Sequence, residues 1–323
     1  MPMPDAVRGI LRAMRRELLW CILGTIILGV AIPSVAVAVG QATVILVALM
    51  MVGLGLGLGL GPVRAVLRRW PRVFAIVGMQ LVASLGLAWV LSYLVQSGSA
   101  RAGLRALGAM PAEVMAGIMV QAAGGNLPMA LAIVAASVLV SGFLLPLVVV
   151  TPKMTSVVFS PLETLGWVVL ALLAPLGLAA AMREAEPRLA AWDEEAGGLA
   201  ILSVLLLGFA AGGHAATHGS GERLEIAFLV LAFTLGGYAI GYGIARLLRA
   251  DPGEARAILL TSGMREFGVA IGYSLAFLRG DAPMVAATYG VVLLILGPLF
   301  AQADRQGLLS RWLPRNGEER SDR

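Results

Sequence analysis

The stretch TSGMREFGVA, residues 261–270, places Arg265 and Glu266 side by side within a segment that is otherwise typical of a membrane interior. An ionised side chain at mid-membrane costs about 2.5–3.5 kcal/mol on insertion scales, and such residues usually face a cavity or a partner. A second carboxylate, Glu113, follows Pro111 in the apolar stretch LRALGAMPAEVMAG. These charged residues are therefore candidates to bind a substrate or a coupling ion, and a buried carboxyl group could carry a proton.

The competing interpretation of Arg265 and Glu266 is a structural ion pair. Adjacent residues on a helix point about 100° apart, so the two are poorly placed to pair with each other. Each is expected to have its own partner, and Glu113 is the natural candidate for Arg265.

The composition defines the class of protein in which these charges must be positioned. The chain has 323 residues, of which 59% are hydrophobic and 13% charged, and its mean hydropathy is +0.88. These values exclude a soluble globular chain and indicate an all-α integral membrane protein. Cys21 is the only cysteine, which excludes a disulfide framework and a cysteine metal cluster. The arginines lie between hydrophobic runs, so the basic charge favours membrane topology over nucleic-acid binding.

About 20 apolar residues are needed for each crossing, and the hydrophobic runs predict ten spans. The predicted spans cover residues 18–38, 43–61, 73–95, 104–123, 127–150, 162–182, 198–215, 225–248, 257–278 and 283–302. Lysine and arginine are concentrated on one side of this arrangement, eighteen against five. The positive-inside rule therefore predicts a multi-pass protein of the inner (plasma) membrane with both termini cytoplasmic. Residues 1–17 would form a cytoplasmic amphipathic segment and residues 304–323 a cytoplasmic basic tail.

Two segments of the chain indicate an internal repeat. GNLPMALAIVAASVLVSGFL (125–144) and GDAPMVAATYGVVLLILGPL (280–299) align without gaps, with seven of twenty positions identical. In the predicted topology the two copies run in opposite directions, which is typical of transporters built from two inverted five-helix repeats.

The span before each copy carries the unusual residues. Proline at position 111 removes a backbone donor, so span 4 is expected to break near residues 110–113. Glycine at positions 263 and 268 makes unwinding of span 9 inexpensive. Broken helices at membrane depth persist only where their free backbone groups meet protein or a watery cavity. We therefore expect helices 4 and 9 to be broken and to cross at a cavity lined by the charged residues.

Four further segments resemble the bile acid:sodium symporter family. LGVAIPSVA (28–36) is similar to the first span of that family, and ALMMVGLGLGL (48–58) to its second. RRWPRVFAIVGMQLVASLGLAW (68–89) is similar to the third span, with Gln80 at the family's glutamine. GYGIARLLRADPGEARAILLTSGMREFGVAIG (241–272) resembles the stretch that runs into span 9.

The resemblance extends from about residue 20 to 303 and implies one ten-span transporter domain, 18–303. It implies a panel domain (spans within 18–61 and 162–215) and a core domain (spans within 73–150 and 225–302). It also implies sodium-coupled uptake of organic anions, with a site near the crossing. The candidate substrate-binding or ion-binding residues are Gln80, Glu113, Asn126, Thr261, Ser262, Met264, Arg265 and Glu266. For Asn126, capping of the following helix is the competing interpretation.

The departures from the family pattern affect its sodium sites. In PAEVMAG (111–117), the family's serine and asparagine ligands are replaced by Ala116 and Gly117. The sodium-binding glutamate of span 9 falls on Thr261, and a family glutamine falls on Arg265. A guanidinium within about 4 Å opposes Na⁺ by roughly 4 kcal/mol at an effective dielectric of 20. We therefore expect sodium binding at Gln80, Thr261, Ser262 and Met264 to be weak, with Arg265 as a built-in cation or a proton as the coupling ion.

The function that the sequence favours is secondary active transport of a small organic anion by alternating access. The expected partners are that anion and the lipid bilayer, with no nucleic acid, and no cofactor is expected beyond Na⁺ or H⁺. The alternatives are a non-transporting sensor or a channel on the same fold, and an arsenite-type efflux carrier of the same superfamily. The chain lacks paired membrane aspartates and a His-Glu-x-x-His motif, so we do not expect an enzyme.

Overall fold

The computed structural model describes residues 9, 13–14, 17–58, 64, 68–149, 162, 166, 169–218, 223–278 and 280–305. Every named element in these ranges is a helix, as the sequence predicts. In chain order they are α2 (Leu18–Ala31), α3 (Pro33–Gly40), α4 (Thr43–Leu58), α6 (Trp70–Ser92), α7 (Gly98–Ala109), α8 (Met115–Ala122), α9 (Leu127–Val149), η1 (Val169–Leu173), α11 (Ala174–Ala185), η2 (Pro187–Trp192), α12 (Asp193–His218), α13 (Arg223–Leu247), α14 (Pro252–Gly263), α15 (Phe267–Phe277) and α16 (Ala282–Arg305). Most of the expected N-terminal segment (1–17) and of the tail (304–323) lies outside the described residues.

Five of these helices are long and apolar enough to cross a membrane. They are α6, α9, α12, α13 and α16, and a bent pair formed by α2 and α3 adds a sixth if it counts as one span. Large apolar side chains such as Val82, Phe143 and Phe228 are exposed on their outer faces, which is the surface that lipid would cover. Length and composition therefore indicate a multi-pass membrane protein.

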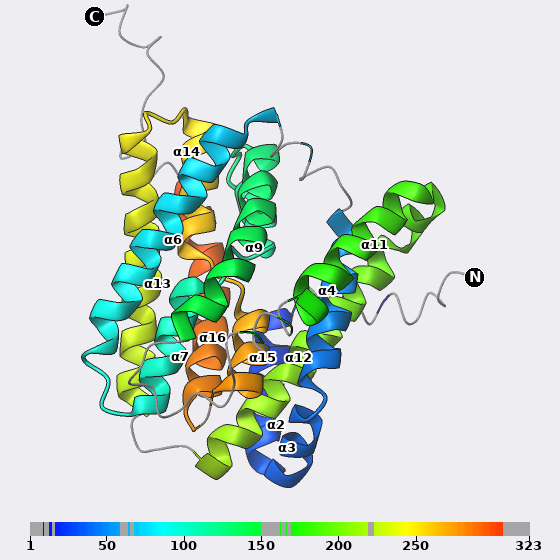
Figure 1. The fold of residues 1–323 in the computed structure, drawn as a ribbon, viewed down its shortest axis with the longest axis vertical. Coiled ribbons are helices and arrows are strands. Elements are labelled where there is room, and N and C mark those ends of the chain that lie inside the picture. The colour runs from blue at the N-terminus through cyan, green and yellow to red at the C-terminus, as the bar shows by residue number, and fades with distance from the viewer. Residues whose placement is uncertain are drawn as a thin grey trace, which may run out of the picture.

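The helices pack in two groups. In the first group α12 packs against α2, α3 and α4, and α11 packs against α4. In the second group α13 packs against α14 and α16, and α6 packs against α7 and α9. Figure 1 shows the two groups side by side, with α15 and α16 near the seam between them. The contacts of α12 with α16 and of α4 with α15 join the groups.

Glycines allow close approach both within the first group and across the seam. A Cβ on Gly53 would lie 2.4 Å from the carbonyl oxygen of Ala196 on α12. Across the seam, a Cβ on Gly268 would lie 2.7 Å from Met50 Sδ, and one on Gly272 would lie 2.3 Å from Val47 Cγ2. These helices can approach only because the glycines carry no side chain.

The first predicted span, residues 18–38, is not one straight helix. α2 ends at Ala31, and α3 begins at Pro33 with a bend of 112° between them. Proline has no backbone N–H and its ring clashes with the preceding turn, so a straight helix cannot continue through position 33. Ile32, the residue between the two helices, has φ −128° and ψ 64°, outside the helical region.

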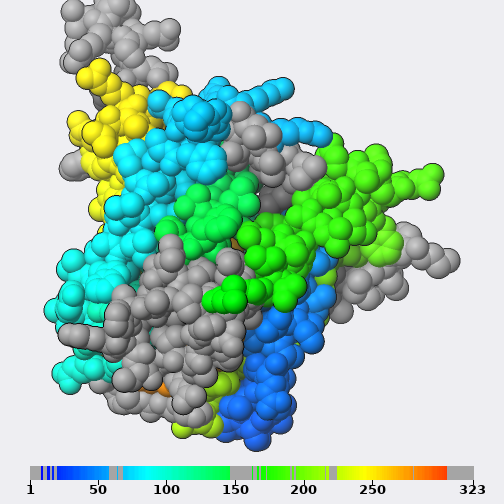
Figure 2. Space-filling view, viewed as in Figure 1, coloured from blue at the N-terminus to red at the C-terminus, as the bar shows by residue number. Residues whose placement is uncertain are grey.

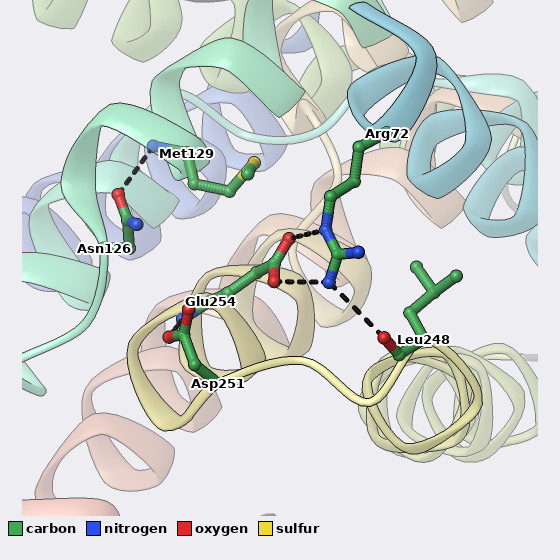
Figure 3. Close-up of polar contacts among 6 residues, drawn as sticks. All are labelled: Arg72, Asn126, Met129, Leu248, Asp251 and Glu254. Carbon is green, nitrogen blue, oxygen red and sulfur yellow. Dashed lines mark hydrogen bonds and ion pairs between the residues drawn. The ribbon is translucent and has the colours of Figure 1, made fainter. Parts of the chain in front are cut away.

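Polar contacts fix the ends of the second group that lie near α14. Asp251 Oδ1 accepts a hydrogen bond of 2.8 Å from Glu254 N and so caps α14. Arg72 at the start of α6 donates to both carboxylate oxygens of Glu254, at 2.5 and 2.7 Å. Asn126 Oδ1 accepts from Met129 N at 3.0 Å, which confirms the capping interpretation for this residue. Figure 3 shows these contacts together, with Arg72 reaching from α6 to α14.

The Arg72–Glu254 contact is expected to contribute to the free energy of unfolding. Glu254→Gln removes the charge from a side chain that is only 6% exposed and leaves the guanidinium with weaker acceptors. The expected loss is about 1–3 kcal/mol of unfolding free energy, seen as a lower melting temperature in detergent. Glu186→Gln is the matched control, because Glu186 pairs loosely with Arg188 at 3.8 Å on an exposed surface. Equal melting temperatures for the two variants would contradict the assignment.

Candidate functional site

The two interrupted helices cross at their non-helical segments. α7 ends at Ala109 and α8 begins at Met115, while α14 ends at Gly263 and α15 begins at Phe267. The two gaps pair as a short antiparallel bridge with Ala112 opposite Arg265. Both expected breaks are therefore present, and they meet.

Backbone hydrogen bonds hold the crossing together. Glu113 N donates to Met264 O at 2.9 Å, and Glu266 N donates to Pro111 O at 2.9 Å. These bonds satisfy groups that would otherwise be left free at membrane depth, where each costs several kcal/mol.

A hydroxyl group from the following helix supports each break. Ser137 Oγ on α9 accepts from Ala112 N at 2.9 Å. Tyr289 on α16 accepts from Arg265 N at 2.6 Å and donates to Gly263 O at 3.1 Å. Neither Ser137 nor Tyr289 was predicted from the sequence, because a lone hydroxyl in an apolar span has no distinctive spacing.

The extended backbone at the crossing sends neighbouring side chains to opposite faces. In a strand-like segment successive side chains alternate, whereas residues directly opposite each other share a face. Arg265 therefore shares its face with Ala112, and the flanking residues Glu113 and Glu266 point the other way. The predicted pairing of Arg265 with Glu113 is wrong for this reason. It assumed helical geometry where the backbone is extended.

On the first face, Arg265 lies at the end of α7. Its side chain is buried, at 1% exposure, and the guanidinium donates to Met110 O at 3.3 Å and to Gln80 O at 3.1 Å. Within the described part of the chain, no carboxylate lies within ion-pair distance of it. Met110 is the C-cap of α7, so the partial negative charge of a helix C-terminus stabilises the cation.

Gln80 joins the remaining candidates on this face. Its amide nitrogen donates to Ser262 Oγ at 2.8 Å and to Thr261 Oγ1 at 3.0 Å. The Thr261 and Ser262 hydroxyl oxygens are thus engaged by the Gln80 amide nitrogen, and the Met264 carbonyl is engaged by Glu113 N. Gln80 Oε1 is buried with no hydrogen-bond partner among the described residues. The cluster surrounds the charge of Arg265 with hydrogen bonds, and Arg265 Nε is a second buried atom without a partner among the described residues.

On the second face, Glu113 and Glu266 form a carboxyl pair. Both are buried, at 4% exposure, and the two carboxyl groups are close enough to interact electrostatically. Glu113 accepts from Phe267 N and from Met115 N, each at 3.4 Å. Phe267 and Met115 are the first residues of α15 and α8, so the carboxyl pair sits at two helix N-termini, where negative charge is stabilised.

This pair faces a cavity of about 410 Å³ between the two helix groups. α4 and α12 line one side, while α8, α9 and the start of α15 line the other. Most of the lining is apolar, as in Leu54, Ile118 and Val204, and Glu113 and Glu266 are its charged members among the described residues. Glu266 Oε2 is buried without a hydrogen-bond partner in the same part of the chain. The cavity has the size of a small-molecule site.

Asn126 lies away from the crossing. Its backbone N–H donates to Gly253 O at the start of α14, whereas Thr261 and Ser262 lie near the end of that 12-residue helix. At 1.5 Å per residue, about 12–15 Å separates them. The structure therefore brings the other seven candidates together at the crossing, on its two faces, and places Asn126 elsewhere.

The apolar helices indicate a polytopic membrane protein, and interrupted helices that cross at membrane depth are typical of transporters. The chain belongs to the SBF-like CPA transporter family, whose model matches residues 16–300. A search of curated proteins found no match. The family supports the resemblance to bile acid:sodium symporters and agrees with the expectation that the chain is not an enzyme.

Replacing Arg265 tests its structural part in the crossing. Arg265→Met keeps an unbranched, flexible side chain but leaves Met110 O and Gln80 O without this donor. A buried unsatisfied acceptor costs about 1–3 kcal/mol, so the melting temperature in detergent should fall. Arg265→Lys keeps the charge and should retain more stability than Arg265→Met. A methionine variant as stable as the parent chain would show that these bonds contribute nothing.

Proposed function

We propose that the chain is a secondary active transporter of a small organic anion, driven by protons through the Glu113–Glu266 pair. The observation that carries the proposal is the position of the pair. It lies at the N-termini of two half-helices, in a cavity between two helix groups. In transporters with broken helices, such half-helix N-termini hold anionic groups at the seam between moving parts.

At the level of architecture, the proposal keeps the ten-span inverted repeat, with α7–α8 as helix 4 and α14–α15 as helix 9. The second helix group would be the core domain and the first the panel domain. α15 and α4, which meet closely at the α15 glycines, would lie at the boundary between the two domains. Alternating access would then be movement of the core domain against the panel domain. The protein would lie in the inner membrane, with both termini on the cytoplasmic side.

A proton would control whether an anion can enter the cavity. With one proton shared, the carboxyl pair carries one negative charge, and an anion 4 Å away pays roughly 4 kcal/mol at an effective dielectric of 20. A second proton makes the pair neutral and weakens its hold on the helix N-termini. The backbone N–H groups of Met115 and Phe267 could then bind the anionic substrate. Substrate and proton would move together in the same direction.

Arg265 would take the place of sodium in this scheme. The guanidinium donates to carbonyl groups at the position where the resemblance locates a cation. A fixed positive charge next to those oxygens opposes Na⁺ and cannot dissociate. Sodium coupling would accordingly be weak or absent.

A second candidate is exchange of an organic cation for a proton. The unpartnered Glu266 Oε2 and the acidic character of the cavity lining favour it. The two candidates move protons in opposite senses relative to the substrate. In proteoliposomes that contain a pH-sensitive dye, substrate added outside should acidify the lumen during symport and make it alkaline during exchange.

A ligand-binding screen can identify compounds to test as transport substrates. Small carboxylates and sulfonates, with tetraethylammonium as a cationic probe, can be ranked by the rise in melting temperature of the purified protein. Saturable uptake with counterflow of the best compound would establish a carrier. Binding without flux would instead favour a sensor, and flux without saturation a channel.

Sodium dependence gives a sharp test of Arg265. We expect the parent chain to show the same melting temperature and uptake in sodium chloride as in choline chloride. Arg265→Gln removes the charge and supplies an amide oxygen close to the Gln80 carbonyl, so sodium should now raise the melting temperature by about 2–4 °C. Arg265→Met, which adds no oxygen, should stay insensitive. Several-fold stimulation of uptake by sodium in the parent chain would overturn the proposal that Arg265 takes the place of the sodium ion.

Proton coupling is tested on the carboxyl pair. An inward proton gradient should stimulate uptake of the selected compound, because protonation neutralises the pair. Glu266→Gln and Glu113→Gln should each abolish that stimulation, while Glu186→Gln, on an exposed surface, should retain it. The measurement is initial uptake at equal and unequal pH. An unchanged response in both cavity variants would rule out the pair as the proton site.

A further inference from the structure

A second cavity lies at the start of α6 and α9, away from the crossing. Its volume is about 510 Å³. Arg64, Arg68 and Arg69, from the connection between α4 and α6, line it together with Asn126. In the sequence, this connection runs from α4 of the first helix group to α6 of the second. In the space-filling view the start of α6 (cyan) and α11 (green) lie at the same end of the molecule (Figure 2).

The arginines around this cavity differ in how their charges are balanced. Arg72 is neutralised by Glu254, and Arg64 pairs with Glu184 on α11. Arg68 and Arg69 have no carboxylate within ion-pair distance in the part of the chain that the structure describes. Arg68 and Arg69 are neighbours in the sequence and are both exposed, and two positive charges that line one cavity favour an anion there. Arginine is also the side chain that best matches the geometry of phosphate.

The start of α9 adds a second attraction for an anion. Asn126, Pro128 and Met129, at the start of this 23-residue helix, line the cavity. The partial positive charge of a helix N-terminus adds to that of the arginines. Asn126 caps the helix from its own side chain, and Figure 3 shows this cap with the Arg72–Glu254 contact.

The remaining lining is apolar, which indicates an amphipathic ligand. Val73, Pro128, Met129 and Ala132 line the cavity together with the arginines. Next to Val73 on α6, Trp70 is 60% exposed and Phe74 is 40% exposed, and tryptophan is typical of the membrane interface. A free phosphate ion would use the arginines only, whereas a phospholipid would use the arginines and the apolar lining.

We propose that this cavity binds an anionic phospholipid, with the headgroup phosphate on Arg68 and Arg69 and the acyl chains along the apolar lining towards α6. The positive-inside pattern places the cavity at the cytoplasmic leaflet, where anionic lipids are enriched. A lipid bound there would contact the connection between the two helix groups. This inference does not depend on the proposed substrate or on proton coupling.

The test compares binding of defined lipids to the full chain purified in detergent. Dioleoylphosphatidylglycerol should raise the melting temperature by about 2–4 °C more than dioleoylphosphatidylcholine does. The double variant Arg68→Gln/Arg69→Gln should lose this difference, since it removes the two arginines of this cavity that have no carboxylate partner among the described residues. A matched double variant, Arg188→Gln/Arg246→Gln, removes two exposed arginines elsewhere and should keep it.

Two further measurements make the outcome decisive. Native mass spectrometry should show phosphatidylglycerol retained by the parent chain and the Arg188/Arg246 variant, but lost from the Arg68/Arg69 variant. The variant Arg68→Lys/Arg69→Lys keeps the charge and should retain at least part of the binding, which separates lost binding from lost folding. Equal retention by the glutamine variant would overturn the proposal. Inorganic phosphate that reproduces the full effect of the lipid would overturn the lipid assignment.

Discussion

The structure depends on the mutual satisfaction of two broken helices inside an apolar chain. Each break exposes backbone groups that membrane cannot satisfy, and each supplies the partners that the other lacks through Glu113 N–Met264 O and Glu266 N–Pro111 O. The buried charged side chains also lie at the ends of the broken helices. The guanidinium of Arg265 lies at a helix C-terminus, and the carboxyl pair lies at helix N-termini. Neither arrangement would be stable on an uninterrupted helix.

This geometry separates two chemical roles that the family resemblance would place in one site. The Arg265 face holds its own cation, whose guanidinium donates to Met110 O and Gln80 O. The carboxyl face is open to the cavity and retains an unpartnered oxygen, Glu266 Oε2, among the described residues. A fixed charge on one face and a titratable pair on the other can coexist because the extended backbone directs them apart.

Much of the fold could be predicted from hydrophobic runs, proline and glycine, because burial and helix breaking are local properties of a sequence. The breaks near Pro111 and Gly263 were predicted correctly, whereas the bend at Pro33 was missed within a run that is long enough to span. The geometry of the candidate functional site was harder to predict. Gln80, Thr261 and Ser262 meet as the resemblance implies. The face to which the Arg265 side chain points could not be predicted, because the backbone there is extended and the prediction assumed a helix. Tyr289 and Ser137 carry no local signal and become visible only in three dimensions.

The two seam glycines, Gly268 and Gly272, have a mechanical consequence. The side chains of Met50 and Val47 lie directly against the backbone of α15 at these two positions. A larger residue at either glycine would have to displace them and would push α4 away from α15. The width of the cavity beside the carboxyl pair therefore depends on two residues that carry no side chain.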